Sequence, residues 1–217
     1  MPLDTETDLV ECRTKRAAER RRRIAKAARK LFVEKGFHGT GVAKIAADSG
    51  VGVGQLYRDF ASKEEIVAEI VQTHVGIFLD EEGLRDAVLR QDGNAARQWL
   101  SRFLEEGGQH DEHATDDCAI FAEIHAEASR NDRIATIVRD TDARVRNNIA
   151  TALAVLAPGA ASAGRRTMLA RIILSLAHGL WHRLITDPGA PQAELAHFAS
   201  ELLQPEIDAL IAASRPA

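Results

Sequence analysis

The residues best suited to chemistry lie close together in the first third of the chain, and they are hydrogen-bonding groups. Gln55, Tyr57 and Arg58 occur within four positions, and Lys63 follows soon after. A glutamine amide can bond adenine at two points, and an arginine guanidinium can do the same with guanine. Tyrosine and lysine often bond phosphates, which positions a protein on DNA without reading its sequence. This set of side chains predicts contact with double-stranded DNA.

A short helix is needed to present these side chains, and the sequence predicts one from about Val53 to Asp59. Leu56 and Phe60 stand four residues apart, which places both on one inward face of such a helix. The outer arc then carries the other large side chains of the segment, namely Val53, Gln55, Tyr57 and Arg58.

A second short helix is predicted just before the first. Val42 and Ile45 keep helical spacing, and Thr40 stands where a side-chain oxygen could cap the first free amides. Gly50 and Gly52 permit a tight turn between the two helices. Two short helices joined by such a turn form a helix-turn-helix, which reads DNA. A helical hairpin without nucleic acid is the alternative, and the ordered succession of cap, helix, turn, helix and lysine argues against it.

The stretch from Gly41 to Glu65 resembles the amino-terminal domain of the TetR family, the tetracycline-repressor-like bacterial regulators. The family pattern is approximately IAxxAGVSxGxLYxxFxSKEEL, and the match covers roughly residues 20–66. Ser49 and Ile66 are mild departures from this pattern. The matching positions are Ile45, Ala46, Gly50, Val51, Gly54, Leu56, Tyr57, Phe60, Ser62, Lys63, Glu64 and Glu65.

Three further departures from the family pattern bear on the DNA contacts. Gly41 stands where the family often has Thr or Ser, and Gly52 replaces the serine that usually caps the reading helix. Asp59 places an acid on that helix, where phosphate would repel it unless it faces a basic neighbour or accepts from a cytosine amine. The predicted DNA-binding residues are Arg22, Arg23, Thr40, Gly41, Lys44, Val53, Gln55, Tyr57, Arg58 and Lys63.

A longer amphipathic helix precedes the motif and ends at about Gly36. Ile24, Leu31 and Phe32 keep the spacing of one apolar face, and glycine is a suitable carboxyl-terminal stop. Four arginines, residues 20–23, stand before this face. They predict phosphate or minor-groove contact, and a solvated basic turn is the alternative.

Charge is distributed unevenly along the chain, although the net charge is only −4. Residues 1–63 contain 14 Lys and Arg against 8 Asp and Glu, whereas residues 64–217 contain 14 against 24. A basic head on an acidic body is the charge pattern expected when only the head meets phosphates.

The bulk composition predicts a helical protein in a reducing compartment. The 217 residues are 45% apolar and 28% charged, as in ordinary globular proteins. The two cysteines, Cys12 and Cys118, do not form a disulfide framework. Because no apolar run is long enough for a bilayer and the amino terminus is acidic without a signal segment, we expect a cytoplasmic protein and no membrane partner.

The pattern of helices and breaks predicts an all-α fold with three parts. Residues 1–18 are expected to be a flexible tail, and residues 19–62 a three-helix DNA-binding domain. Residues 63–217 are expected to form a helical domain, for which the resemblance implies ligand binding and dimerisation. Ser62 caps the helix that opens the last part. The acidic segment 80–86 predicts a break, and Pro205 predicts a kink or an end in the last long helix.

The resemblance implies a ligand cavity in the last part and a dimer through its two terminal helices. Candidate pocket residues are Trp99, Phe103, Phe121, Ile124, His125 and Trp181, with Glu123 as a further polar anchor; ordinary core packing is the alternative for each. Candidate dimer residues lie on unusually wide apolar stripes, and they are Ile172, Leu176, Leu180, Leu195, Phe198 and Leu202.

Neither possible metal site has convincing spacing. His178 and His182 are four residues apart and could chelate a metal, but packed histidines are the more common case. The segment 110–118 holds histidines, acids and Cys118 without a motif, so a solvated loop is the default. We predict no metal and no cofactor.

The leading hypothesis is a transcriptional regulator that binds a near-palindromic operator as a homodimer. The resemblance implies repression, with release by a small-molecule effector through population shift. A second hypothesis makes the carboxyl-terminal domain only a dimerisation or protein-docking module. A small helical enzyme is disfavoured, because the sequence holds no convincing nucleophile–base set and no phosphate-binding glycine loop.

Overall fold

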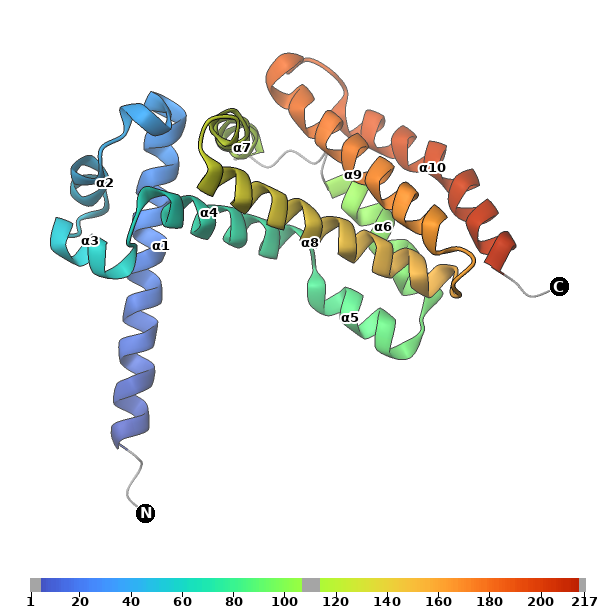
Figure 1. Ribbon diagram of the computed structural model, residues 1–217, viewed down its shortest axis with the longest axis horizontal. Helices are drawn as coiled ribbons and strands as arrows, with labels where there is room; N and C mark the ends of the chain where they lie inside the picture. The colour runs from blue at the N-terminus through green and yellow to red at the C-terminus, as the bar shows by residue number, and fades with distance from the viewer. Residues whose placement is uncertain (1–4, 107–113, 215–217) are drawn as a thin grey trace. The chain divides into compact units, whose positions relative to one another are not determined.

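The computed structural model describes residues 5–106 and 114–214, and within these ranges the chain forms α-helices and no strand (Figure 1). The predicted all-α fold is confirmed. The helices are α1 (Thr5–Gly39), α2 (Val42–Ser49), α3 (Val53–Asp59), α4 (Lys63–Phe78), α5 (Glu81–Arg90), α6 (Gly93–Glu106), α7 (Ala114–Ala128), α8 (Asp132–Leu156), α9 (Ala163–Thr186) and α10 (Gln192–Ser214).

The chain divides into two compact units. Unit 1 holds the residues up to Thr73 together with Glu123–Ile137, and unit 2 holds His74–Ala122 together with the residues from Val138 onward. Three helices, α4, α7 and α8, therefore contribute residues to both units. This division differs from the predicted boundary at residue 62, because the first turns of α4 belong to the compact unit that contains α1–α3.

The core of unit 1 joins α1, α2 and α3. Ile24 and Phe32 of α1, Ile45 of α2 and Leu56 of α3 are all almost fully buried. Gly50 follows α2 with a left-handed backbone (φ 67°, ψ 28°), which glycine adopts without the steric cost of a Cβ atom. The predicted bounds of the helix-turn-helix agree with the structure.

Helix α1 is longer at its start than the sequence predicted. It begins at Thr5, so residues 5–18, which we expected to be a flexible tail, are helical. The segment is rich in Ala, Arg, Lys and Glu, which favour helix and continue without a break into the buried part of α1. Residues 1–4 lie outside the described residues.

The end of α1 corrects the predicted role of Thr40. Regular helix stops at Gly36 (φ 73°, ψ 166°), as predicted. The Thr40 hydroxyl donates to the carbonyl oxygens of Leu31 (3.0 Å) and Gly36 (2.9 Å), so it satisfies the end of α1. Helix α2 is capped by Gly41 without a side-chain hydrogen bond. We predicted that the Thr40 hydroxyl caps the amides of α2, but it donates to free carbonyl oxygens of α1.

The start of α4 has the predicted cap. The Glu65 amide donates to Ser62 Oγ (3.4 Å), and Glu65 Oε2 accepts from the Ala61 amide (2.8 Å). This reciprocal pair satisfies free donors at the helix start.

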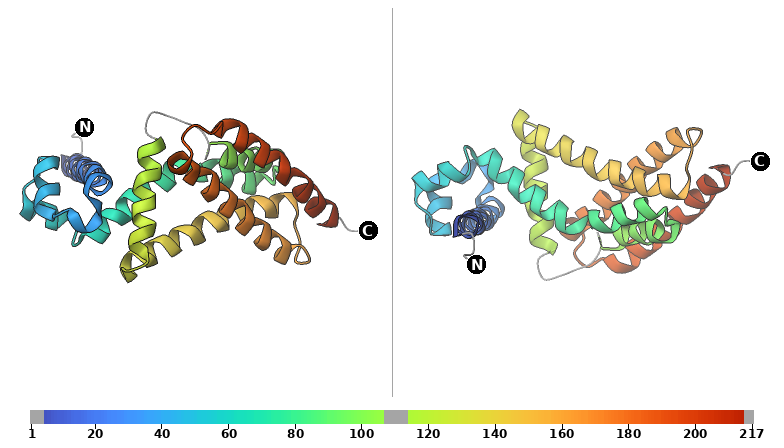
Figure 2. Two further views of the ribbon diagram at one scale, coloured as in Figure 1. Left: turned by 90° about the horizontal axis from the view of Figure 1, so that it is seen from above. Right: turned by 90° about the horizontal axis from the view of Figure 1, so that it is seen from below.

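Unit 2 contains α5, α6, α9 and α10 with parts of α4, α7 and α8. Helices α9 and α10 lie side by side, and α6 packs against both (Figures 1 and 2). The predicted break over residues 80–86 was wrong, since α5 begins at Glu81. Asp80 caps α5 through the Gly83 amide (3.1 Å), and the Trp99 indole donates to the Asp80 carbonyl (3.2 Å), so contacts from α6 hold the helix start in place.

Helix α10 also continues through Pro205, where we predicted a kink or an end. Arg97 of α6 donates to Gln204 and to Asp208 (2.9 Å to Oδ1), one on each side of the proline. Leu203 and Ile207 are buried. These contacts across α6 offset the hydrogen bond that proline cannot donate.

Candidate nucleic-acid interface

Helix α3 presents the side chains that the sequence assigned to its outer arc. Leu56 is buried, whereas Tyr57 is 53% exposed and Val53 and Arg58 are also exposed. The apolar inner face fixes the helix against the core of unit 1, and the opposite face leaves aromatic, amide and guanidinium groups free to meet DNA.

A chain of hydrogen bonds runs along α3 through Gln55. Its Oε1 accepts from Arg58 Nη2 (2.7 Å) and Nε (3.1 Å), and its Nε2 donates to Asp59 Oδ2 (3.3 Å). The amide of Gln55 therefore has one cationic and one anionic neighbour, and each accepts only one orientation of that amide.

Asp59, the acid that phosphate would repel, faces basic neighbours on α1. Arg20 holds it with two bonds, Nε to Oδ2 (2.5 Å) and Nη2 to Oδ1 (2.7 Å), and Arg21 donates to its carbonyl oxygen. The hydrogen bonds from Arg20 lower the pKa of the Asp59 carboxyl, and the same contact raises the pKa of Arg20. Of the two alternatives for Asp59, the basic neighbour is the one found in the structure.

The four arginines before the apolar face of α1 divide into two pairs. Arg20 and Arg21 face inward, and Arg21 also donates to Glu69 Oε2 (2.6 Å) and lies over the Phe60 ring (4.0 Å). Arg22 and Arg23 are exposed, and Arg22 pairs with Glu19 of its own helix (3.1 Å). Phosphate contact by the exposed pair stays a prediction, whereas the inward pair tethers α1 to α3 and α4.

Three other predicted contact residues have different surroundings. Lys44 is exposed and pairs with Asp48 (2.8 Å), and Gly41 is exposed at the start of α2. Lys63 donates to the carbonyl oxygens of Phe37 (2.8 Å) and Thr40 (3.0 Å). Because an ammonium group has three donors, Lys63 can hold the end of α1 and still offer one hydrogen to phosphate.

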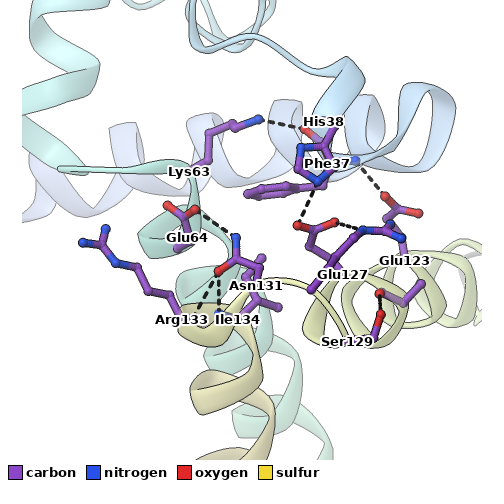
Figure 3. A network of polar contacts seen from close by, with 12 residues as sticks. Phe37, His38, Lys63, Glu64, Glu123, Glu127, Ser129, Asn131, Arg133 and Ile134 are labelled. Atoms are coloured by element: carbon purple, nitrogen blue, oxygen red, sulfur yellow. Dashed lines mark hydrogen bonds and ion pairs between the residues drawn. The ribbon is translucent and has the colours of Figure 1, made fainter.

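Residues of α7 and of the turn before α8 contribute a polar network to unit 1 whose contacts the sequence did not indicate (Figure 3). Glu123 accepts from the Phe37 amide (2.7 Å), which is left free where α1 breaks. Glu127 is only 1% exposed, and its carboxylate lies 3.1 Å from His38 Nε2. Asn131 donates to Glu64 of α4 (3.2 Å). The partners are far apart in sequence, so no local pattern could have indicated them.

Asn131 also caps α8. Its Oδ1 accepts from the amides of Arg133 (3.1 Å) and Ile134 (3.3 Å). One side chain therefore fixes the start of α8 and its attachment to α4 within unit 1 (Figure 3).

The pocket candidates do not form a single group. Trp99 and Phe103 stack on each other in unit 2 (5.7 Å between centroids), and the Trp99 indole donates to the Leu79 carbonyl (2.8 Å). Ile124 is buried and His125 is exposed, and both belong to unit 1. Trp99 and Phe103 thus have the surroundings of core residues.

Phe121 and Trp181 belong to an aromatic cluster inside unit 2, which also includes His74. The centroid distances are 4.8 Å from His74 to Phe121, 5.5 Å from His74 to Trp181 and 5.0 Å from Phe121 to Trp181. Asp117 Oδ1 lies 3.6 Å from His74 Nδ1. This cluster brings three rings and a carboxylate together inside unit 2.

Four of the six dimer candidates are exposed apolar side chains of the neighbouring helices α9 and α10, and we call them the apolar row. Phe198 is 57% exposed and Leu202 is 60% exposed, and Ile172 and Leu195 are also exposed. Leu176 and Leu180 are half-buried. Met168, which we had not assigned to this face, is exposed one turn before Ile172.

In the part of the chain that the structure describes, no three His, Cys, Asp or Glu side chains converge as metal ligands. Residues 110–113 of the second possible metal site lie outside the described range. Over the same described residues, no helix is both long and apolar enough to cross a bilayer.

This fold and this site define a DNA-binding regulator of the helix-turn-helix class. The model of the bacterial regulatory proteins of the tetR family matches residues 24–70. The model of the BetI-type transcriptional repressor, C-terminal, matches residues 96–212, which is more than half of the chain. The chain belongs to the TetR family of bacterial transcriptional regulators, a family of DNA-binding proteins and the class we expected instead of an enzyme.

The curated relatives match only part of this chain. An HTH-type transcriptional regulator of Staphylococcus aureus strain USA300 is 38% identical over 65 residues, which are 30% of this chain and 35% of that protein. The match therefore spans about a third of the length of that relative.

Solved structures share the whole fold at low identity. A transcriptional regulator from Pseudomonas aeruginosa PAO1 has a TM-score of 0.72 and 19% identity, and the match covers 91% of this chain and 95% of that one. A regulator from Saccharomonospora viridis, solved in complex with choline, has a TM-score of 0.61 and 21% identity, covering 86% and 96%. At these identities the likeness shows the fold alone.

Proposed function

We propose that this regulator is a repressor that binds a near-palindromic operator as a homodimer and is released from it by a small organic cation. The observation that carries the proposal is the exposed face of α3, where Tyr57 and Arg58 project from a helix that is fixed to the core of a TetR-type head. A palindrome follows from a two-fold dimer, because two reading helices meet half-sites about one DNA turn apart.

The dimer is supported by the apolar row on α9 and α10. Phe198, Leu202, Met168 and Ile172 are each at least half exposed. Several large apolar side chains exposed on two neighbouring helices are uncommon on the surface of a monomer and favour a partner surface there. A second copy presents the same row, which a two-fold interface requires.

The class of effector is supported by the aromatic cluster of His74, Phe121 and Trp181. Ring faces attract quaternary ammonium groups, and a neighbouring carboxylate adds to that attraction. The Saccharomonospora viridis regulator was solved with choline, and this chain matches the BetI-type repressor domain. Choline is therefore the first ligand to test.

Release of DNA requires that the effector favours one conformation over another. Phe121 stands on α7 two residues before Glu123, and Glu123 accepts from the Phe37 amide at the end of α1. A ligand that shifts α7 would act on the contacts of Glu123 and Glu127 in unit 1, and α4 offers a second route. We propose both α4 and α7 as coupling helices.

The operator is tested by selecting random duplexes on the purified full-length protein at moderate salt. We expect a palindrome with two half-sites, and the size of the bound species should correspond to two copies of the chain. If only salt-sensitive binding without a consensus is recovered, the protein does not read sequence and the repressor proposal fails.

The effector is tested on the selected operator with choline and with its neutral isostere 3,3-dimethyl-1-butanol. Choline should weaken operator binding, whereas the isostere should not, because only the charged headgroup is attracted by ring faces. Trp181→Leu should remove the response and leave operator affinity unchanged. If neither compound alters affinity, the cationic effector is excluded, and a carboxyl-terminal domain that serves only dimerisation or protein docking becomes the better description.

A further inference from the structure

We infer that Asp59 is a positioning residue for sequence reading: held by Arg20, it orients the Gln55 amide, and that amide in turn orients Arg58. The inference rests on the proposed function, since it assumes that α3 reads base edges. It assigns a role in specificity to two residues, Arg20 and Asp59, that face each other instead of the DNA.

The anchor of this arrangement is the contact between α1 and the end of α3. Arg20 grips the Asp59 carboxylate with two parallel bonds of 2.5 and 2.7 Å, and such bidentate pairs fix direction as well as distance. The Asp59 side chain is only 8% exposed. Its carbonyl oxygen accepts from Arg21 as well. Arg20 and Arg21 of α1 therefore hold Asp59 in place, and α1 belongs to the same compact unit as α3.

The next step runs from Asp59 to Gln55. A carboxylate only accepts hydrogen bonds, so the nitrogen end of the Gln55 amide must face Asp59, at 3.3 Å. Arg58 only donates, so the oxygen end must face Arg58, at 2.7 Å. Asp59 and Arg58 therefore both favour the same orientation of the Gln55 amide, and together they fix it.

In this arrangement Gln55 and Arg58 both retain hydrogen-bond donors that can contact bases. An amide nitrogen has two hydrogens, and only one of them can bond Asp59. The guanidinium of Arg58 uses Nε and Nη2 on Gln55, and its Nη1 hydrogens remain available to a base. The chain of bonds thus presents a donor from Gln55 and donors from Arg58 before any DNA is bound, and preorganised donors avoid the cost of ordering them on binding.

Asp59→Asn should disturb this presentation without removing volume. Arg20 Nε and Gln55 Nε2 both donate to Oδ2 of Asp59, and Arg20 Nη2 donates to Oδ1. Asparagine has a single carbonyl oxygen, so its NH2 group must face either Arg20 Nη2 or both Arg20 Nε and Gln55, and in each orientation a donor meets a donor. The two-point contact with Arg20 is lost in both cases, and with it the fixed position of the group that orients Gln55. The substitution also removes a negative charge that repels phosphate, so it should not weaken attraction to DNA in general.

The experiment compares wild-type protein, Asp59→Asn and Arg20→Lys on the selected operator, on single-base variants of it and on unrelated duplex. For Asp59→Asn we expect operator affinity to fall about tenfold, in the range of one mismatched base pair, while affinity for unrelated duplex stays equal or rises. Arg20→Lys keeps the charge but loses the two-point grip, so it should give a smaller loss of the same pattern.

Two controls separate positioning from charge and from folding. Asp48→Asn removes the same charge from α2, where Asp48 pairs with Lys44 (2.8 Å), and it should change affinity equally for all sequences. In a Gln55→Ala background, Asp59→Asn should cause no further loss of discrimination, because the residue through which it acts is gone.

The outcomes distinguish the inference from the proposed function. If wild-type protein selects no operator, the proposed function fails before the variants are tested. If wild-type selects an operator and Asp59→Asn strengthens or weakens binding to all duplexes alike, the proposed function stands and the positioning role of Asp59 is wrong. A loss of discrimination that persists in the Gln55→Ala background would also overturn it.

Discussion

The exposed face of α3 and the exposed row on α9 and α10 are built on opposite principles. On α3, polar side chains are bonded to one another and to α1, as in the contacts of Gln55 with Arg58 and Asp59. On α9 and α10, large apolar side chains such as Phe198 and Leu202 stand exposed. The first face is ordered by directional bonds before any partner arrives, and the second is held only by its helices.

This difference corresponds to what each partner demands. Base edges are distinguished by the direction of donors and acceptors, so a reading face must fix its polar groups. The proposed dimer would form mainly through burial of apolar area, which has no preferred direction. Substitutions on the two faces should therefore have different effects on oligomeric state, DNA affinity and base preference, and these effects can be measured.

The largest effect is expected from Phe198→Glu on the apolar row. A buried unpaired carboxylate at the centre of the interface should separate the dimer, and operator affinity should fall by a factor of about 100 or more, because a desolvated unpaired charge costs several kcal/mol. Light scattering would give the molar mass, and binding to the selected operator would give the affinity.

The matched control for Phe198→Glu is Leu89→Glu. Leu89 is 76% exposed on α5, away from the apolar row. It should leave both the mass and the affinity unchanged. If Phe198→Glu and Leu89→Glu behave alike, the row on α9 and α10 is not the dimer interface, and the contrast between the two faces loses its explanation.

A smaller effect is expected from Gly36→Ala, which tests the unit that carries α3, at the point where α1 breaks. The backbone of Gly36 (φ 73°, ψ 166°) lies in a region almost restricted to glycine, and a Cβ atom would lie 3.2 Å from Glu123 Oε1. We expect a loss of about 1–3 kcal/mol in the stability of the head, seen as earlier thermal unfolding of α1–α3.

Gly54→Ala is the control for this substitution. Gly54 lies within α3 without a left-handed backbone, and a Cβ atom there would meet nothing within 4 Å. Alanine should hold or raise thermal stability at this position, since glycine weakens a helix interior. Equal losses from Gly36→Ala and Gly54→Ala would show that the break in α1 is not a point of strain.

The sequence predicted those parts of the head that depend on local patterns. The bounds of α2 and α3 follow from apolar spacing and from Gly50 and Gly52, which act over a few residues. The position of Asp59 could be described only as an alternative, because its partner Arg20 is 39 residues away. Long-range pairs leave no periodic signal in one sequence.

Two errors in the sequence analysis have the same origin. Helix α5 was missed because its acidic, glycine-containing start resembles a break, and what stabilises it is the contact of Asp80 with Trp99 of α6. Helix α10 does not end at Pro205, where Arg97 of α6 bonds Asp208. In these two cases a tertiary contact outweighed a local preference. Thr40 was assigned to the helix that follows it, but its hydroxyl bonds the end of α1, which precedes it.

The pH dependence of stability gives a test that compares the two units. The hydrogen bonds from Arg20 lower the pKa of Asp59 in unit 1, and those from Arg144 lower the pKa of Glu81 in unit 2. A lowered carboxyl pKa stabilises the folded state above the ordinary value, about 4, and this stability is lost as the pH falls through the lowered value.

Asp59→Asn and Glu81→Gln should therefore each lower the thermal midpoint at pH 7 and lose this effect towards pH 3. Only Asp59→Asn should also relax base preference at pH 7, since Glu81 lies on α5. Thermal unfolding at both pH values and operator selection at pH 7 provide the measurements. A destabilisation that stays constant from pH 7 to pH 3 would contradict the assignment of these ion pairs.

The smallest effect is expected from Tyr57→Phe, and it isolates DNA contact from folding. Tyr57 is 53% exposed, so removing its hydroxyl should leave thermal stability unchanged. If the hydroxyl bonds a phosphate, affinity should fall severalfold for every duplex, and the salt dependence should stay the same because no charge is removed.

Lys63→Met provides the contrast, because Lys63 holds the carbonyl oxygens of Phe37 and Thr40. Its loss should lower the stability of the head, and if it also contacts phosphate it should reduce the salt slope by about one. A polar group on the reading face can thus serve the DNA alone, as we expect of Tyr57, or the fold and the DNA together, as we expect of Lys63. Should Tyr57→Phe change base preference instead of overall affinity, the hydroxyl reads a base edge, and Tyr57 joins Gln55 and Arg58 as a determinant of sequence.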